Sequence, residues 1–270
     1  MQNSYEIIWI ESTASTNDLA RAQIHNTDNM TVIAAERQTS GRGQRGNSWN
    51  SAPGKNLTFS IILKFQEFLS DNAVMAYDQS VISQMTALSV IDLLATHGIA
   101  AKVKWPNDIY VGNLKICGIL IENSITGKWL STSIIGIGLN VNQTEFDPKL
   151  PNPTSILNEN GTQTDHHLLL EEFMDIFCGY CRRYLNGKGG YARLRKLYHS
   201  QLWKLGEPSE FYDYTTLPEG HLTGPSTDVH EDAERFTGII CGVSDTGNLL
   251  VEKNEGELKE FAFKEIGYIF

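Results

Sequence analysis

The chain has 270 residues, of which 41% are hydrophobic, and it carries a formal net charge of −10 at pH 7. This is enough apolar sequence for one large core and a small appendage, and no apolar run is long enough to span a bilayer. The acidic charge argues against a broad nucleic-acid-binding face. No basic segment followed by an apolar run opens the sequence, so we expect a globular cytoplasmic protein with no membrane or DNA partner.

The first part of the chain alternates between predicted strands and a short helix. Residues 5–11 form a predicted strand, and the polar run Ser15-Thr16-Asn17-Asp18 then offers N-cap residues for a helix. Residues 31–35 are a second apolar strand, which leads through Gln38 into a segment rich in glycine and arginine. Because alternating apolar residues resume at 59–63, we expect that segment to lie between two strands.

The glycine-rich segment is Gly41-Arg42-Gly43-Gln44-Arg45-Gly46. Glycine tolerates positive φ and has no Cβ, so this backbone can bring its N–H groups close to an anion. The guanidinium groups of Arg42 and Arg45 match phosphate or carboxylate oxygens. A positive loop on an acidic body suits a small anionic ligand. We expect a phosphate-containing ligand here, and an ordinary solvated basic turn is the alternative.

Two familiar phosphate-binding motifs do not fit this loop. It satisfies the G-x-G-x-x-G pattern of dinucleotide-binding proteins, but that pattern must open a helix, and here Trp49, a Pro53-Gly54 turn and a strand follow. A Walker A loop ends in Gly-Lys-Ser or Gly-Lys-Thr, whereas this loop continues as Gly46-Asn47-Ser48. The lysine, catalytic-loop and metal motifs of a protein kinase are absent downstream. These comparisons exclude a Rossmann-type, P-loop or kinase site.

The middle of the chain combines one long helix with several strands. Helical spacing of apolar residues predicts a helix over residues 74–94, and Gly98 supplies its end. The predicted strands that follow cover residues 101–105, 116–122 and 129–142. The chain turns between the first two of them at Pro106-Asn107-Asp108 and Gly112-Asn113.

Three polar clusters lie at the ends of these strands. Lys104 to Asp108 sets a lysine before a rigid corner that carries two short polar side chains. Lys115 to Glu122 places a second lysine at the start of the next strand, with Gly118 allowing close approach, and Gly136 to Asn140 ends a third strand in an amide. Each cluster alone has a structural explanation, since Pro-Asn-Asp is a common turn and a lysine at a strand end is usually solvated. Their joint occurrence indicates one binding site.

The last third of the chain changes in character. Residues 165–203 return to helical spacing, whereas beyond Leu205 short strands alternate with turn residues. This pattern predicts a small β-barrel-like appendage with a surface loop at residues 218–234. The four cysteines lack the spacing of a complete zinc site, and we expect all of them to be reduced thiols: Cys117, Cys178, Cys181 and Cys241.

With these residues in view, the chain resembles the biotin protein ligases, also called biotin–acetyl-CoA-carboxylase ligases. The resemblance covers nearly the whole chain and rests on segments that occur in the family's order and approximate spacing: Ser15-Thr16-Asn17, Gln38, Gly41 to Gly46, Trp49, Lys104 to Asp108, Lys115 to Glu122 and Gly136 to Asn140. It implies an α+β fold. A mixed β-sheet catalytic domain with helices, of the class II synthetase-like biotin/lipoate ligase type, would occupy residues 1–204, and a small SH3-like β-barrel would occupy residues 205–270.

The resemblance also implies a reaction and a site. ATP, with Mg²⁺, would activate biotin as biotinyl-5′-AMP with release of pyrophosphate, and biotin would then pass to a lysine in the biotin-carrier domain of a carboxylase or decarboxylase. Catalysis is assigned to Lys115, Arg42 and Asp108. Biotin binding is assigned to Ser15, Thr16, Asn17, Gln38, Gly41, Arg42, Lys115 and Gly118. Binding of ATP and the adenylate is assigned to Arg42, Gly43, Gln44, Arg45, Trp49, Asn107, Lys115 and Asn140.

Several of these residues keep a structural alternative. Ser15 and Thr16 suit helix capping, Asn107 and Asp108 suit a turn, Trp49 suits a core position, and Asn140 suits the end of a strand. The chain also departs from the family pattern, which commonly has arginine in place of Gln44 and often a basic residue near Asn47. These departures leave open how tightly the loop holds an adenylate.

The resemblance leaves some choices of form and function. The catalytic motifs begin within about twenty residues of Met1, which indicates the short monofunctional form without a winged-helix DNA-binding domain. The sequence does not decide whether the chain forms a homodimer. A lipoate ligase would share the architecture but lacks the arginine-glycine loop and the Lys-Trp-Pro-Asn-Asp run. A non-catalytic biotin-binding regulatory module is the third reading, and the presence of both Arg42 and Lys115 argues against it.

Overall fold

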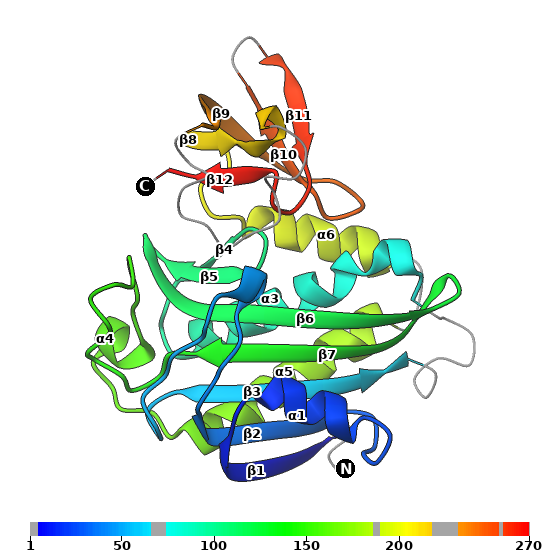
Figure 1. Cartoon of the computed structure of the whole chain (residues 1–270), viewed down its shortest axis with the longest axis vertical. Coiled ribbons are helices and arrows are strands. Elements are labelled where there is room, and N and C mark those ends of the chain that lie inside the picture. Colours follow the sequence, from blue (N-terminus) through cyan, green and yellow to red (C-terminus); the bar gives the residue numbers. More distant parts are fainter. Residues whose placement is uncertain (1–4, 66–73, 186–189, 218–231, 254–255, 270) are drawn as a thin grey trace.

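The computed structural model describes residues 5–65, 74–185, 190–217, 232–253 and 256–269. Its strands form two sheets, a seven-stranded one in the order β1-β2-β3-β7-β6-β5-β4 and a five-stranded one in the order β11-β10-β9-β8-β12 (Figure 1). In the larger sheet β1 and β2 are parallel, and the other neighbouring pairs are antiparallel. The strands of this sheet are β1 (Glu6–Thr13), β2 (Thr31–Gln38), β3 (Leu57–Lys64), β4 (Lys102–Lys104), β5 (Asp108–Val111), β6 (Leu114–Thr126) and β7 (Trp129–Leu139).

Helices cover both faces of the larger sheet. The short helix α1 (Thr16–Gln23) packs on β2, β3 and β7, whereas α3 (Ser80–Thr96) and α5 (His166–Tyr184) pack on the opposite face and on each other (Figure 1). Successive side chains of a strand point to opposite faces. In β2, Val32 therefore joins the large core with α3 and α5, whereas Ile33 joins a small cluster with Ala20 of α1. Because both faces of the sheet are covered, β3 is buried over nearly its whole length.

The predicted long helix begins later than its apolar spacing indicates. The segment at residues 74–76 instead pairs with the turn between β6 and β7, since the backbone N–H of Leu130 donates to Val74 O and that of Ala76 donates to Lys128 O. A 3₁₀ turn, η2 (Ala76–Asp78), then leads into α3. Backbone pairing with a distant strand has overridden the local helical pattern. At the other end Gly98 takes a positive φ of 75° and terminates the helix, as predicted.

The C-terminal part forms the second sheet. Its strands are β8 (Pro208–Asp213), β9 (Glu234–Val243), β10 (Leu249–Glu252), β11 (Leu258–Phe261) and β12 (Ile266–Tyr268). The helical region before it divides into α5 and α6 (Gly190–Ser200), and the remaining short elements are η1 (Gln44–Gly46), α4 (Ile156–Asn160) and η3 (Tyr214–Thr216). The predicted α+β architecture, a mixed sheet with helices and a separate antiparallel sheet, is confirmed. The domain boundary at residue 205 stays a prediction, and most of the predicted loop at residues 218–234 lies outside the described residues.

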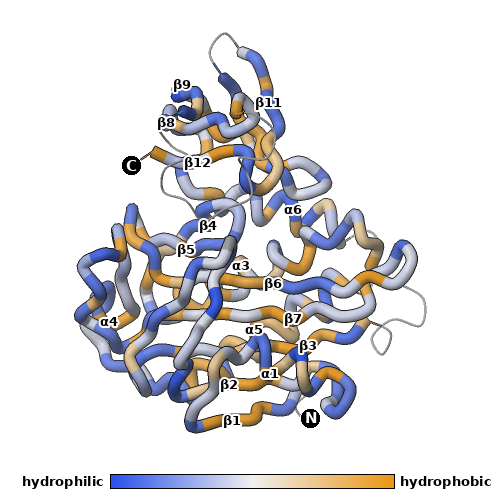
Figure 2. Tube along the Cα trace, viewed as in Figure 1, coloured by the Kyte–Doolittle hydropathy of each residue, from blue (hydrophilic) through white to orange (hydrophobic). Residues whose placement is uncertain are grey.

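Hydropathy follows this arrangement. Figure 2 shows hydrophobic segments along the central strands of the larger sheet and hydrophilic segments in the connections around it. No helix within the described residues is long and apolar enough to cross a membrane. The four cysteines are free thiols, and Cys117, Cys178 and Cys181 are buried.

Candidate functional site

A pocket lies on the face of the larger sheet that carries α1. Its floor is formed by β6 and β7, and the segment between β2 and β3 crosses in front of these strands (Figure 1). Most of the predicted site residues line it: Ser15, Thr16, Asn17, Gln38, Arg42, Gly43, Gln44, Trp49, Asn107, Asp108, Lys115 and Gly118. The volume open to water is about 50 Å³. This is room for only a few water molecules.

One wall of the pocket is a connected set of hydroxyl and amide groups at the start of α1. Ser15 is the N-cap of that helix, and its side chain accepts from the backbone N–H of Asp18. The side-chain carbonyl of Gln38 accepts from the backbone N–H of Thr16 at 2.8 Å and lies 3.2 Å from the Thr16 hydroxyl. The buried hydroxyl of Ser60 lies 2.8 Å from Thr16 Oγ1. These contacts fix donors and acceptors in place before any ligand binds.

Asn17 extends this set across the floor of the pocket. Its Nδ2 donates to Glu122 Oε2 at 3.1 Å, and its Oδ1 accepts from Ser60 at 2.6 Å. A Cβ on Gly136 would lie 2.1 Å from Asn17 Oδ1, so only glycine leaves room for this amide. Gly136 therefore shapes the site without offering a side chain.

The indole of Trp49 lies on a second bare patch of the sheet. A Cβ on Gly138 would lie 2.4 Å from its ring, and one on Gly118 would lie 3.0 Å from it. The indole Nε1 is buried and has no hydrogen-bond partner within the part of the chain that the structure describes. The close approach of Trp49 O to Gly41, 2.3 Å from where a Cβ would stand, explains the glycine there. Gly41 thus supports the loop and is not part of the pocket lining.

Arg42 lies at the mouth of the pocket between two carboxylates. Its Nη1 contacts Asp18 Oδ1 at 2.6 Å, and its Nη2 contacts Glu122 Oε1 at 3.2 Å. Partial burial lowers the pKa of Arg42, but the charges of Glu122 and Asp18 outweigh it and raise that pKa above its usual value. Arg21 also pairs with Glu122. The guanidinium of Arg42 is therefore held near the pocket by contacts that are only half buried.

Lys115 enters the pocket from the start of β6. Its Nζ lies 2.7 Å from Asp108 Oδ1 and 5.6 Å from the centre of the Trp49 ring. Asp108 follows a corner that contains a cis peptide bond between Trp105 and Pro106. The side chain of Asn107 braces that corner by donating to the carbonyl of Ile119 at 2.7 Å. A cation and a carboxylate are thus paired beside the ring that closes the pocket.

A second lysine, Lys104, lies behind this pair, next to the C-terminal sheet. Burial lowers the pKa of Lys104 to about 8. The charge of Asp108 acts in the opposite direction, and the charges of nearby lysines lower this pKa further. The Nζ of Lys104 lies 5.0 Å from the ring centre of Tyr110 and 4.8 Å from that of Tyr268 in β12. Trp105 Nε1 donates to the carbonyl of Gly247 at 2.9 Å. The corner that carries Asp108 is therefore anchored on the second sheet.

Asn140 is placed differently from the predicted residues that line the pocket. Asn140 is buried outside the pocket lining, where its Nδ2 donates to the carbonyl of Thr154 at 2.9 Å and its backbone N–H donates to Ile116 O. It braces the segment after β7, as the alternative of a strand-terminating amide predicts. Arg45 lies in η1, and its side chain lies outside the described part of the structure.

Sequence reasoning missed several residues of the site. The cluster from Gly136 to Asn140 was singled out for its amide, whereas its glycines Gly136 and Gly138 form the bare floor. Ser60, which joins Thr16 and Asn17 of α1 to the sheet, and Asp18 and Glu122, which hold Arg42, were not assigned to the site. The alternation Gly-Ile-Gly in β7 was a usable signal, because period-two glycines leave one face of a strand without side chains. Ser60 gave no signal, since a single serine within a predicted strand does not indicate a binding site.

Comparison with known proteins shows which proteins this chain is similar to. Residues 9–140 match the Biotin/lipoate A/B protein ligase family. The bifunctional ligase/repressor BirA of Bacillus spizizenii is 29% identical over 94% of this chain and 70% of that protein. The biotin–[acetyl-CoA-carboxylase] ligase of Paracoccus denitrificans is 26% identical over 90% of this chain and 93% of that protein. The structure of the biotin protein ligase from Aquifex aeolicus in complex with biotin and ATP matches with a TM-score of 0.74 at 26% identity, over 97% of each chain. Residues 9–140 thus carry a domain of the Biotin/lipoate A/B protein ligase family.

The domain match and the names of these relatives confirm the resemblance drawn from the motifs. The family profile ends at residue 140, close to the end of β7, and therefore includes the segments that line the pocket. The pocket supplies two cationic side chains, a row of hydroxyl and amide groups and one aromatic ring. Among its described lining residues Asp108 is the only carboxylate, and it is paired with Lys115. The site is thus built to bind an anion next to a polar, uncharged group.

Proposed function

We propose that this protein is an ATP-dependent biotin protein ligase. It activates biotin as biotinyl-5′-AMP with release of pyrophosphate and transfers biotin to a lysine of a biotin-carrier domain in a carboxylase or decarboxylase. The observation that carries the proposal is the convergence of Arg42 and Lys115, far apart in the sequence, on one pocket that also contains Ser15, Thr16 and Gln38. The names of the relatives favour biotin over lipoate as the substrate.

The first step brings together two anions, the carboxylate of biotin and the α-phosphate of ATP. They repel each other, so the site must neutralise charge that develops on the phosphate oxygens. Lys115 is placed for this, because its ammonium group lies inside the pocket. Arg42 adds a second cation at the mouth, with planar donors that match two phosphate oxygens.

The polar wall suits the ureido ring of biotin, which offers both donors and acceptors. The Gln38 carbonyl, the Ser15 and Thr16 hydroxyls and the Asn17 amide are already oriented by their mutual contacts. Preorganised groups lose little entropy when a ligand binds. This arrangement supports a pose in which the ring end of biotin lies at the polar wall and its carboxylate faces Lys115.

The loop between β2 and β3 then acts as a cover. In the structure Trp49 fills the space above Gly118 and Gly138, so ATP and biotin enter only if this loop moves. Biotinyl-5′-AMP is a mixed anhydride that water destroys, and a loop that closes on it both excludes water and retains it. The unpaired indole N–H of Trp49 offers a donor to a bound ligand.

In the second step the acceptor lysine attacks the biotinyl carbonyl and AMP leaves. No covalent enzyme nucleophile is needed, and burial raises the pKa of the nearest thiol, Cys117, well above its usual value. Asp108 is placed to orient the incoming amine, since it lies beside Lys115 at the corner. The C-terminal sheet supports this corner through Trp105 and Lys104.

The site also fits the use of Mg²⁺ with the nucleotide. Mg²⁺ commonly binds through one or two carboxylates together with substrate phosphates and waters. Within the described lining Asp108 is the single carboxylate, which suits an ion held mainly by the phosphates of ATP. The ion would supply further charge neutralisation at the triphosphate.

One reconstituted assay tests the proposal. The full chain, ATP, Mg²⁺, and either biotin or lipoate are combined with a biotin-carrier domain, and pyrophosphate release and carrier mass are followed. We expect pyrophosphate release with biotin and a single modified lysine on the carrier. Equal or greater activity with lipoate would assign the chain to the other branch of the family. Absence of pyrophosphate release with either acid would contradict a ligase function.

A further inference from the structure

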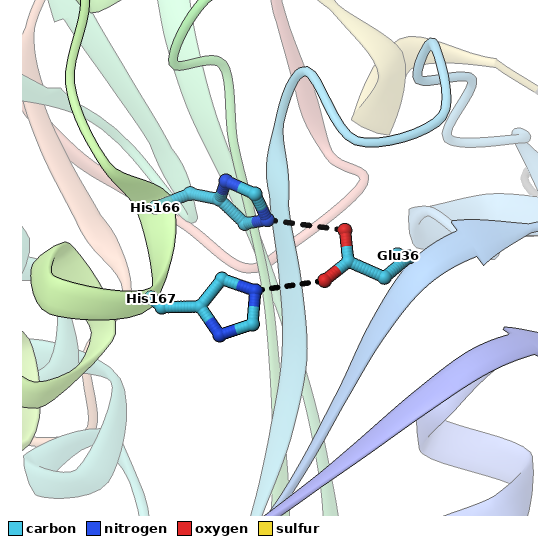
Figure 3. A group of neighbouring side chains, drawn as sticks. All are labelled: Glu36, His166 and His167. Atoms are coloured by element: carbon cyan, nitrogen blue, oxygen red, sulfur yellow. Dashed lines mark hydrogen bonds and ion pairs between the residues drawn. The ribbon is translucent and has the colours of Figure 1, made fainter.

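A second polar cluster lies at the other helical face of the larger sheet, where α5 meets β2. Figure 3 shows the imidazoles of His166 and His167 directed at the two carboxylate oxygens of Glu36. His166 Nε2 lies 3.1 Å from Glu36 Oε2, and His167 Nε2 lies 2.8 Å from Glu36 Oε1. None of the three residues belongs to the lining of the ligand pocket.

The two rings are held in this orientation by their surroundings. The indole of Trp9 in β1 stacks on His167 with ring centres 3.8 Å apart and an interplanar angle of 17°. The same indole meets His166 edge to face at 5.6 Å. Asp165, the N-cap of α5, accepts from the backbone N–H of His167 at 2.8 Å and so fixes the first turn. The cluster is therefore preorganised by three separate elements.

The geometry is that of a metal site more than of a simple ion pair. One ligand atom from each residue can be chosen so that all lie within 4.8 Å of one another. Donors bound to zinc at about 2.0–2.2 Å stand roughly 3.3 Å apart in a tetrahedron, so small side-chain movements would suffice. Elsewhere in the described chain His97 pairs with Glu172 at 3.0 Å through a single imidazole. A histidine–glutamate ion pair needs only one imidazole, whereas Glu36 has two.

The donor set also selects the class of ion. Two imidazole nitrogens and one carboxylate are typical of Zn²⁺ and neighbouring transition metals, whereas Mg²⁺ and Ca²⁺ prefer oxygen ligands. The helix N-terminus disfavours a cation, but Glu36 and Asp165 place two carboxylates at this end of α5. The side chain of His167 is 47% exposed, which leaves a path for the ion and a place for a water ligand.

We propose that Glu36, His166 and His167 form a binding site for a single Zn²⁺ ion, with water in the remaining position. The ion ties the start of α5 to β2. It stabilises the folded chain, because the unfolded chain does not hold the three donors together. The site is independent of the proposed ligase reaction and needs neither ATP nor biotin.

The test uses the full chain after chelator treatment, titrated with zinc chloride alone by calorimetry and followed by thermal denaturation. We expect one ion per chain and a higher Tm with zinc. His167→Ala and Glu36→Gln, which lie on different elements, should each lower zinc affinity by on the order of 100-fold and abolish the Tm shift. His97→Ala is the matched control and should bind zinc as the wild type does.

Cobalt gives a second readout, since Co²⁺ takes zinc sites and its visible spectrum reports the coordination. The wild type should show the intense bands of a four-coordinate ion, and Glu36→Gln should not. Circular dichroism of each variant checks that it is folded. Zinc binding that is as tight in folded His167→Ala and Glu36→Gln as in the wild type would overturn the assignment. So would a wild type that binds no zinc.

Discussion

Replacing Lys115 by methionine separates its charge from its length, and we expect adenylate formation to fall by on the order of 10² to 10³. That loss corresponds to about 3–4 kcal/mol of transition-state stabilisation. The variant also leaves Asp108 without its partner at 2.7 Å. Because the side chains of Lys115 and Asp108 are 32% and 19% exposed, water replaces part of the lost contact, and the cost in unfolding free energy should be about 1–2 kcal/mol. The catalytic loss should therefore exceed the loss of stability.

The companion variants are Asp108→Asn and the double variant with Lys115→Met, compared by single-turnover pyrophosphate release and by transfer to the carrier. If Lys115 neutralises phosphate, the double variant stays as slow in adenylation as Lys115→Met. Asp108→Asn alone should keep adenylation within about tenfold of the wild type and slow the transfer step more strongly. Recovery of adenylation in the double variant would refute the argument. It would mean that Lys115 serves only to balance Asp108.

Three further perturbations address the cover, the floor and the corner of the site. Arg42→Ala should let the adenylate escape, seen as labelling of a bystander protein in the absence of carrier; unchanged labelling would count against retention by the loop. Gly138→Ala sets a Cβ 2.4 Å from the Trp49 ring, where carbon contacts prefer about 3.5–4.0 Å, and should raise the KM for ATP and biotin by on the order of tenfold. Gly179→Ala in α5, with nothing within 4 Å, is the control and should only add about 1 kcal/mol of stability. Burial lowers the pKa of Lys104 from 10.5 to about 8 in the folded chain. Between these two pH values the unfolded chain therefore binds more protons than the folded chain, and stability rises with pH. Relative to Lys104→Met, the free energy of unfolding of the wild type should rise by up to about 3 kcal/mol across this window. Urea unfolding near pH 8 and near pH 10 measures it, and a constant difference between the two proteins would contradict the burial argument.

Most of the strands and helices could be predicted from local patterns, because they combine one periodicity with a clear stop signal. The strand β5 could not, since the sequence indicated only turns between residues 105 and 116. Gly98 ends α3 in the left-handed conformation that glycine favours, and Ser15 caps α1. The start of α3 could not be predicted in this way. The backbone at Val74 pairs with Leu130 in β7, and a contact between residues so far apart leaves no trace in helical spacing.

The site could be predicted as a set of residues but not as a geometry. The motifs predicted that most of the residues lining the pocket, including Lys115 and Asp108, lie in one site. It did not show that Asn140 turns away to Thr154, because the same amide suits a ligand and a backbone carbonyl equally well. The zinc cluster was also invisible, since Glu36 and the two histidines stand 130 residues apart and carry no ligand spacing of their own.

The contacts of Arg42 link anion binding to movement of the loop. Its charge is balanced by Asp18 and Glu122. The side chains of Arg42, Asp18 and Glu122 are 40%, 46% and 24% exposed, so both ion pairs are open to solvent. Such pairs contribute about 0–1 kcal/mol each, so a phosphate can take over the guanidinium at little cost. Neither charge repulsion nor strong contacts of Arg42 are therefore needed to control the position of the loop. A cation that exchanges weak carboxylate partners for phosphate oxygens favours closure only when the nucleotide is present, which is the order of events that an unstable anhydride requires.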